Sequence, residues 1–513
     1  MNSPRPSTSL RSRLGLDTFP NILGFLVCIL GVVVAIHANF AGRSLFADEA
    51  AIVYSILNRP FWGLGAGPLP YLQTAPILWM AAVKCVTLVF GSSEVALRSF
   101  SVFSYALTLL LTAWTGRRFF RIRHSWLVAA SLANLLAFLT YATVVKPYEW
   151  EAAAVLLTLA AHALFREKRL PWWGLALAWL ILLLGANPPL FFIGACLLHD
   201  AVSSLRQRDF RGLSVLAGVA ALSLVPYAVY YIWWLRDTAN SSFMQSWWAS
   251  RMLSPWPPTP AVLGREFDRI MGALMNPVFG KRAYTAVWLF LGASVAAFFS
   301  PDSRRRLLPT ALLLALVACA LKSFPLDLRL WVFALPPFCI LVFGMLSDFA
   351  ETSPRLAVPA LILMVTLALG NLGIWRFADR ENVYWLGEEL NPLLDHIRDH
   401  RREGDAVYVM DRAIPGVLYH FGYDFEGFSP EGGDVIWGSN TWNLWTPEGI
   451  LDDARKIETA GRAWLVLIPV NYKTGPLVKH LERVGTVTEV FSDHLTPLYL
   501  FERNPPGALP SAP

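Results

Sequence analysis

The stretch PNILGFLVCILGVVVAIHANFAGRSLFADEA, from Pro20 to Ala50, decides how the rest of the chain is interpreted. Its apolar run, Pro20–Phe40, has the length that an α-helix needs to cross a bilayer, about 20 residues. Two adjacent carboxylates, Asp48 and Glu49, follow where lipid headgroups are expected. Acids in a first helical turn can serve as caps, but capping needs only one. Two ionisable groups at membrane depth therefore indicate a functional site.

The composition of the whole chain has the same character. Of 513 residues, 55% are hydrophobic and 16% are charged, 21 are Trp, and the mean hydropathy is +0.45. These values are typical of a polytopic membrane protein and exclude an ordinary soluble globule. The net charge of +6 does not indicate a nucleic-acid partner, because the basic residues cluster in short loops between apolar runs. The five cysteines lie in apolar stretches without paired spacing, so no disulfide framework is predicted.

Eleven apolar stretches are predicted to span the membrane, with an uncertainty of one or two at the Pro-broken pair around Pro188 and Pro189. They are Pro20–Phe40, Val95–Thr115, Trp126–Val144, Ala152–Phe165, Trp172–Gly185, Pro188–His199, Leu213–Leu235, Ala283–Ser300, Leu307–Leu321, Leu328–Leu346 and Leu356–Phe377. The first is predicted to be a retained helix and not a signal peptide, because it lacks a small-residue cleavage site.

The stretch Pro76–Phe90 is also apolar, but it is short and contains Lys84. If it is re-entrant or interfacial, four Arg-rich clusters fall on the side of the basic N-terminus, as the positive-inside rule requires. These clusters are at 117–123, 166–169, 206–211 and 304–306. If the stretch spans, all four lie outside. We therefore predict that it does not span.

This topology predicts the fold class, a polytopic α-helical membrane protein with a small C-terminal soluble α/β domain. The predicted parts are a cytoplasmic tail (1–19), a transmembrane domain (20–377), an outer α/β domain (378–505) and a disordered tail (506–513). The outer loops of the transmembrane domain are predicted at 41–94, 145–151, 236–282 and 322–328.

A second group of charges lies in VVKPYEWEAAA, at the outer end of one predicted helix and the start of the next. A hairpin there can bring Lys146, Glu149 and Glu151 over the same cavity as Asp48. A solvated Lys–Glu pair explains Glu149 equally well, so Glu151 is the better candidate.

A third group lies in LKSFPLDLRLWVFALPP, where Arg329 begins an apolar helix with Lys322 and Asp327 close by. Arginine can grip a phosphate through two hydrogen bonds, although an Arg at this depth can also simply snorkel to the interface. A sugar on a lipid phosphate needs a cation to neutralise the departing phosphate and a carboxylate to take the acceptor's proton. Arg329 and Asp48 have the chemistry for these roles. The Trp-rich loop FMQSWWASRMLSPWPPTP fits sugar or lipid contact, or an aromatic belt anchor.

These motifs and their order resemble the lipid-linked-sugar glycosyltransferases of the GT-C fold, which include protein O-mannosyltransferases and lipid A aminoarabinose transferases. More closely, the chain resembles a bacterial branch typified by lipopolysaccharide-core glycosyltransferases. The motifs are FADEA, GSSEVALRSFSVFSYALTLLLTAWTGRRFF, VVKPYEWEA and SFPLDLRLWVFALPP, and with the hydropathy pattern they cover about 20–377. EELNPLLDHIRDHRREGDAVYVM resembles the start of the soluble domain in that branch.

The resemblance implies a role for each candidate. Asp48 corresponds to the catalytic base, with Glu49 as its neighbour, and Glu151 to the second acidic site, where many relatives have Asp. Arg329 corresponds to the residue that binds the donor's lipid phosphate. We group Glu149 with the second acidic site, and Lys322 and Lys146 with the phosphate-binding residues.

The resemblance also implies an inverting transferase of the cell envelope that moves a hexosyl or pentosyl group from a polyprenyl-phosphate sugar. The acceptor is a hydroxyl of a glycan, lipid or protein, on the periplasmic or outer side of the inner membrane. Some relatives are helped by a divalent cation and others need none. Two or three carboxylates around one cavity could hold a metal, but no His joins them with ligand-like spacing. A divalent cation is therefore possible, and no obligatory cofactor or metal is predicted.

Two other classes of function stay open. A transporter or flippase of lipid-linked sugars also needs charges facing a cavity, but transporters commonly show two related halves and this chain shows no internal repeat. A non-catalytic scaffold for envelope assembly would leave Asp48 dispensable. The sequence names neither the sugar nor the acceptor nor the oligomeric state.

Overall fold

The computed structural model describes residues 18–65, 67–300, 302–378, 389–421, 435–439, 447–468, 474–493 and 496–505. The predicted disordered tail and all but the last two residues of the predicted cytoplasmic tail lie outside these ranges. The chain forms two compact units. The membrane unit comprises 1–40, 61–68 and 74–379, and the C-terminal unit comprises 41–60, 69–73 and 380–513.

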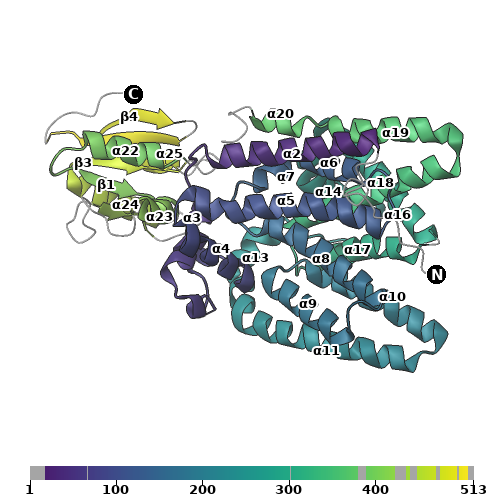
Figure 1. Ribbon diagram of the computed structural model, residues 1–513. Helices are drawn as coiled ribbons and strands as arrows, with labels where there is room; N and C mark the ends of the chain where they lie inside the picture. Colours follow the sequence, from purple (N-terminus) through teal and green to yellow (C-terminus); the bar gives the residue numbers. More distant parts are fainter. Residues whose placement is uncertain are drawn as a thin grey trace. The chain divides into compact units, whose positions relative to one another are not determined.

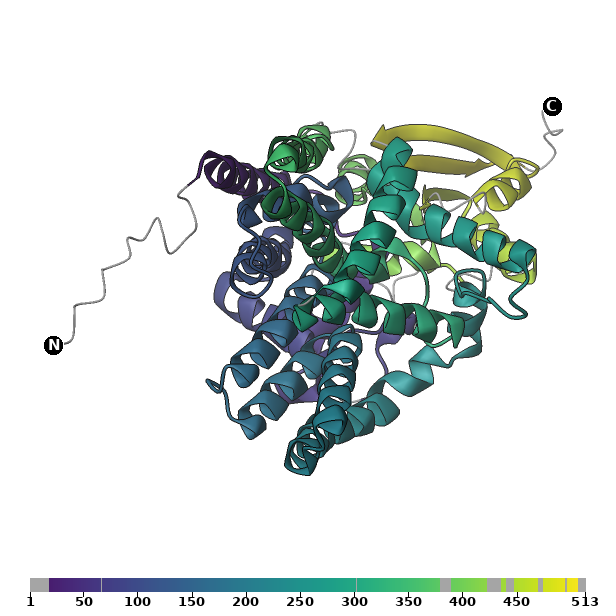
Figure 2. The same cartoon turned by 90° about the vertical axis from the view of Figure 1, so that its right-hand side faces the viewer.

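The membrane unit is a bundle of apolar helices, several of which are seen nearly end-on in Figure 2. Within the described residues, six helical stretches are long and apolar enough to cross a membrane. They are Phe19–Asn39, Glu94–Arg118, Phe210–Thr238, Pro260–Phe299, Leu328–Thr352 and Arg355–Ala378. The protein is therefore a multi-pass membrane protein, and the count of eleven spans stays a prediction.

The membrane unit contains the following α-helices, some of which are short because a predicted span is divided into two helices. They are α2 (Phe19–Asn39), α4 (Ile77–Phe90), α5 (Glu94–Arg118), α6 (Ser125–Ala133), α7 (Leu136–Tyr141), α8 (Tyr148–Arg166), α9 (Trp172–Gly185), α10 (Pro189–Gln207), α11 (Phe210–Tyr230), α12 (Arg236–Ala239), α13 (Ser242–Ala249), α14 (Pro260–Ile270), α15 (Asn276–Phe279), α16 (Ala283–Phe299), α17 (Leu307–Ala320), α18 (Leu335–Thr352), α19 (Pro354–Leu369) and α20 (Gly373–Ala378). A 3₁₀ helix, η7 (Leu328–Ala334), leads into α18.

Close helix packing and helix breaks shape this bundle. Helix α2 packs along α5 and α6 (Figure 1), and Gly24 allows the approach because a Cβ there would lie 2.5 Å from the carbonyl carbon of Trp126. The predicted span Trp126–Val144 is divided into α6 and α7 at Asn134, whose side chain bonds the Ala368 carbonyl and the Ile374 N–H. The break at Pro188 separates α9 from α10, as the two prolines predict.

The C-terminal unit contains a five-stranded sheet in the order β2-β1-β3-β5-β4. Strand β1 (Ala406–Val409) pairs in parallel with β2 (Val435–Trp437) and β3 (Arg462–Val466), and β5 (Thr496–Arg503) pairs antiparallel with β3 and β4 (Gly485–Asp493). Helices α22 (Asn391–His400) and α23 (Ile414–His420) supply side chains to one core, and α24 (Pro447–Ala460) and α25 (Thr474–Leu481) to the other.

Alternation along the strands produces these two cores. Val407 and Val409 belong to the core with α22 and α23, while Tyr408 between them belongs to the core with α24 and α25. A sheet covered on both faces by helices is an α/β sandwich. The predicted α/β domain is confirmed.

The C-terminal unit also includes helix α3 (Ala47–Asn58), which packs against α23. A short 3₁₀ turn, η2 (Pro70–Leu72), packs on α3. The sequence prediction treats this region as part of the loop 41–94 of the transmembrane domain. By its contacts, the segment that carries Asp48 belongs with the α/β domain.

Candidate active site

Two arginines of the membrane unit share one carboxylate. Asp327 precedes η7 and caps it, accepting the backbone N–H of Arg329 at 3.2 Å, while the Nε of Arg329 lies 3.5 Å from the same oxygen. The guanidinium of Arg251 pairs with the other oxygen of Asp327. The backbone reinforces this link, because the Leu326 N–H donates to the Arg251 carbonyl at 2.7 Å. The loop that follows α13 is thus joined to the start of η7.

A tryptophan ring lies beside both cations. The guanidinium carbon of Arg329 is 5.1 Å, and that of Arg251 is 5.4 Å, from the ring centre of Trp248. Aromatic faces attract guanidinium groups at such distances. The side chains of Arg251 and Arg329 are 41% and 26% exposed, so neither is sealed in the core. We call Trp248, Arg251, Asp327 and Arg329 the arginine cluster. Its formal charge is +1, which suits an anion such as a phosphate.

Sequence reasoning missed Arg251. It lies in the Trp-rich loop that was assigned to aromatic contacts, 76 residues before its partner Asp327. One sequence pattern points to Arg251: it is a single Arg directly after WWAS, in a loop predicted to face the same side as Arg329.

Glu149 approaches the arginine cluster from helix α8, which packs against η7. Arg329 lies on η7, so Glu149 and Arg329 belong to two elements that pack together. Glu149 is fully buried, and neither of its carboxylate oxygens has a hydrogen-bond partner among the described residues. A buried carboxyl group without partners costs the fold free energy. Its presence is therefore better explained by chemistry than by stability.

Glu151, two residues further along α8, has a different environment. It is 6% exposed, on a helix that packs against both α9 and α10. At the break between these two helices, the Asn187 side chain accepts a hydrogen bond from the hydroxyl of Tyr227 at 3.2 Å. Of the two acids, Glu149 is the more deeply buried, and it is the one whose carboxylate oxygens have no hydrogen-bond partner among the described residues.

The two lysines grouped with the phosphate site differ in exposure. Lys146 is 5% exposed in the turn before α8. Lys322 is exposed where α17 ends, with a positive φ of 59°. The structure packs α8, which carries Glu149, against η7, which carries Arg329, and no described contact places Lys322 in the arginine cluster.

Asp48 and Glu49 begin α3, in the C-terminal unit. Glu49 is fully buried, pairs with Arg43 at 3.1 Å and accepts the backbone N–H of Phe46 at 3.2 Å, so it closes the first turn of the helix. Asp48 is half-buried. Glu49 is therefore committed to local structure, and Asp48 is the member of the pair with an accessible side chain.

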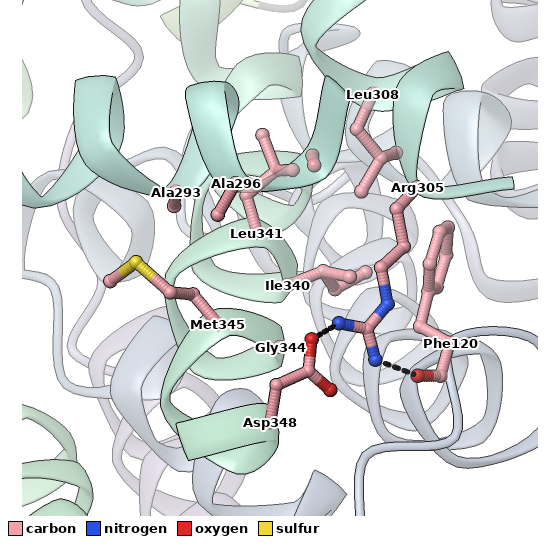
Figure 3. A pocket seen from close by; sticks show the side chains of 11 residues that line it. Phe120, Ala293, Ala296, Arg305, Leu308, Ile340, Leu341, Gly344, Met345 and Asp348 are labelled. Carbon is pink, nitrogen blue, oxygen red and sulfur yellow. Dashed lines mark hydrogen bonds and ion pairs between the residues drawn. The ribbon is translucent and has the colours of Figure 1, made fainter. Parts of the chain in front are cut away.

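In the described part of the chain, no three His, Cys, Asp or Glu side chains are grouped so that they could hold a metal ion. A hollow of about 300 Å³ lies among α16, α17 and α18, lined largely by apolar side chains (Figure 3). Arg305 at its edge pairs with Asp348 and donates to the Phe120 carbonyl at 3.3 Å. None of the predicted site residues lines it.

The helical membrane unit with its C-terminal α/β domain defines a class of fold, the GT-C fold of membrane glycosyltransferases. The likeness is to crystal structures of ArnT from Cupriavidus metallidurans. The form bound to undecaprenyl phosphate aligns with a TM-score of 0.50 at 12% identity, over 96% of this chain and 98% of that chain. The apo form aligns with a TM-score of 0.51 at 13% identity, over 93% and 97%.

Other comparisons are weaker or negative. An oligosaccharyltransferase from Archaeoglobus fulgidus aligns with a TM-score of 0.46 at 13% identity, over 93% of this chain and 74% of that chain. No family model and no curated protein matches the sequence. The likeness to ArnT is therefore one of fold, and it confirms the GT-C fold that the sequence resemblance implied.

Proposed function

We propose that this protein is an inverting glycosyltransferase that moves a sugar from a polyprenyl-phosphate donor to an acceptor hydroxyl. The observation that carries the proposal is the arginine cluster, in which two half-exposed guanidiniums share one carboxylate beside a Trp ring. The surplus positive charge and the aromatic face fit a phosphate carried on a lipid. The likeness in fold to an ArnT structure with bound undecaprenyl phosphate supports the same ligand class.

In the proposed reaction, Arg251 and Arg329 bind the phosphate oxygens of the donor, and Asp327 holds the two guanidiniums in place. The carboxylate of Asp48 takes the proton of the acceptor hydroxyl. The acceptor oxygen forms a bond to the anomeric carbon while the bond from that carbon to the phosphate oxygen breaks, with inversion. The polyprenyl phosphate leaves as an anion, and the arginines neutralise its charge. Glu149 is the second acid of the site.

We propose that the reaction takes place on the periplasmic or outer side of the inner membrane, because the positive-inside rule puts the loops that carry these residues there. The acceptor is a glycan, lipid or protein of the envelope, the sugar is a hexosyl or pentosyl group, and no metal is obligatory. The proposal sets aside a transporter, since the candidate charges belong to loops and helix ends and not to the middle of the spans.

Lipid binding tests directly whether the arginine cluster binds a lipid phosphate. The full chain in lipid nanodiscs is titrated with undecaprenyl phosphate and with undecaprenol, which lacks only the phosphate. Arg251→Gln and Arg329→Gln should each weaken binding of the phosphate form by about 10- to 100-fold, the value of a hydrogen bond to a charged group. Arg282→Gln is the matched control, because Arg282 belongs to the same predicted loop but bonds the Gly370 carbonyl. Equal binding of both lipids would contradict the proposal.

Mass spectrometry of envelope glycans tests the reaction itself. A strain without this gene is complemented with the wild type or with Asp48→Asn. A sugar that returns with the wild type and stays absent with a normally expressed Asp48→Asn protein identifies the product and supports transfer. Full recovery with Asp48→Asn would favour a transporter or scaffold.

A further inference from the structure

The segment that leads into α3 is held by hydrogen bonds to the α/β domain. The backbone N–H of Ser44 donates to the carboxylate of Glu389 at 2.9 Å, across 345 residues of sequence. In the opposite direction, the hydroxyl of Ser44 accepts the backbone N–H of Asn391 at 3.0 Å, at the start of α22. The three residues that form these two bonds all belong to the C-terminal unit. Ser44 is therefore fixed on both its backbone and its side chain.

Glu389 is itself fixed to the sheet. Its backbone N–H donates to the hydroxyl of Thr496, the first residue of β5, at 3.1 Å. Glu389 is 6% exposed, and Ser44 and Thr496 are 1% and 0% exposed. Solvent competes little with these bonds at such burial, so they are stiffer than surface contacts. A continuous chain of hydrogen bonds runs from β5 through Glu389 to Ser44.

Helix α3 is held again just beyond Ser44. The buried Arg43–Glu49 pair closes its first turn, and Leu45 is 2% exposed. Helix α23 packs against α3. Asp48 therefore lies between an anchor at Ser44 and an anchor at Glu49.

We infer that the α/β domain positions the carboxylate of Asp48 and that Glu389 is the positioning residue. This inference rests on the proposed role of Asp48 as the base. A base must lie within hydrogen-bond reach of the proton it removes, and a misplacement of about 1 Å can cost about 100-fold in rate. The Glu389–Ser44 bond sets where the α3 segment begins, so it sets where Asp48 lies. The α/β domain thus acts on the rate of transfer through the position of Asp48.

Kinetics of the full chain in nanodiscs test this role. Glu389→Ala removes the acceptor of the Ser44 N–H and should lower kcat by about 10- to 100-fold, with the KM for the polyprenyl-phosphate sugar unchanged. Glu389→Gln keeps an oxygen at that place and should restore most of kcat. Glu458→Ala is the matched control in the same domain, because its carboxylate pairs with His480 on α25 at 3.2 Å. A kcat for Glu389→Ala equal to that of the control overturns the inference.

Hydrogen exchange followed by mass spectrometry separates this inference from the proposed function. In Glu389→Ala, amides of residues 44–58 should exchange faster, while those of β1 and β3 stay protected. Unchanged exchange in 44–58 overturns the anchor, and faster exchange with normal kcat overturns the positioning role. If the wild-type protein transfers no sugar from any polyprenyl-phosphate donor, the proposed function fails, yet exchange still decides whether Glu389 anchors the segment.

Discussion

Two groups of charged residues in this protein contain arginine and carboxylate, and they differ in balance and exposure. The Arg43–Glu49 pair is neutral, and its side chains are 6% and 0% exposed. The arginine cluster has two cations for one anion, and its arginines are 41% and 26% exposed. A buried ion pair whose two charges cancel is expected to hold the backbone in place and not to bind a charged ligand. An unbalanced, half-exposed cluster has a formal surplus of positive charge, which suits an anionic ligand.

The two acids of helix α8 differ within one helical turn. Glu151 is 6% exposed, whereas Glu149 is fully buried and its carboxylate has no hydrogen-bond partner among the described residues. We therefore expect charged groups whose hydrogen bonds are all formed within the protein to contribute to stability. Charged groups with hydrogen bonds still to be formed are expected to take part in binding or catalysis. The four tests below are arranged from the largest expected effect to the smallest.

Asp48→Asn and Glu49→Gln compare the proposed base with the buried acid beside it. Asp48→Asn should lower kcat by about 100-fold or more, because general-base catalysis typically contributes that much. Glu49→Gln breaks the pair with Arg43 and should instead lower the thermal stability of the purified protein, with a smaller loss of kcat. The measurements are transfer kinetics and thermal unfolding of both variants in nanodiscs. A larger loss of kcat in Glu49→Gln than in Asp48→Asn would reverse the assignment.

The arginine cluster can be dissected with a double-mutant cycle. Arg251→Gln combined with Arg329→Gln should weaken undecaprenyl phosphate binding by more than either change alone, by about 100-fold or more. Asp327→Asn leaves both cations and should change the affinity by only a few fold. The affinity for undecaprenyl phosphate is measured by titration for the wild type, the two single Arg variants, the double variant and Asp327→Asn. If Asp327→Asn weakens binding as much as the double variant does, the cluster is a structural clamp and not an anion site.

Glu149→Gln and Glu151→Gln compare two buried acids on one helix. Glu149→Gln should leave thermal stability unchanged or raise it, since no hydrogen bond is lost, and should lower kcat by about 10-fold if the carboxyl group takes part in proton transfer. Glu151→Gln is the comparison on the same helix and should change stability by no more than about 1 kcal/mol. Transfer kinetics and thermal unfolding curves of both variants and the wild type measure these effects. Equal kinetics for Glu149→Gln and the wild type would make Glu149 a packing residue.

Asp405 is a balanced acid in the α/β domain, and its effect should appear in stability alone. Burial raises its pKa, but bonds from the Arg402 N–H, Arg462 and Trp464 outweigh this and hold the pKa of Asp405 below its usual value. A carboxyl group with a lowered folded pKa stabilises the fold above its unfolded pKa of about 3.9, and this contribution is lost as the pH falls through the folded value.

Asp405→Asn should therefore reduce the protection of β1 and β3 against hydrogen exchange at pH 7, by about 1–3 kcal/mol. The difference from the wild type should shrink as the pH falls below about 4. Protection factors corrected for intrinsic exchange measure it, with transfer activity at pH 7 expected within about twofold of the wild type. A difference that persists undiminished at low pH would show that the carboxylate charge is not the cause.

Several features followed from local chemistry and were predictable. The apolar runs had to become membrane helices, because a bilayer offers no partners to an unpaired backbone. Pro188 and Pro189 had to end a helix, because proline lacks the N–H and clashes with the preceding turn. The alternation of β1 and β3 with helical segments led to the α/β domain.

What the sequence by itself determined is the membrane character, the GT-C fold and the set of candidate charges. Only the tertiary structure decided which charges have partners, because several of those partners are remote in sequence. Arg251 meets Asp327 across 76 residues and Ser44 meets Glu389 across 345 residues. Hydrogen bonds act over a few ångströms of space, and no local pattern encodes which distant group arrives there.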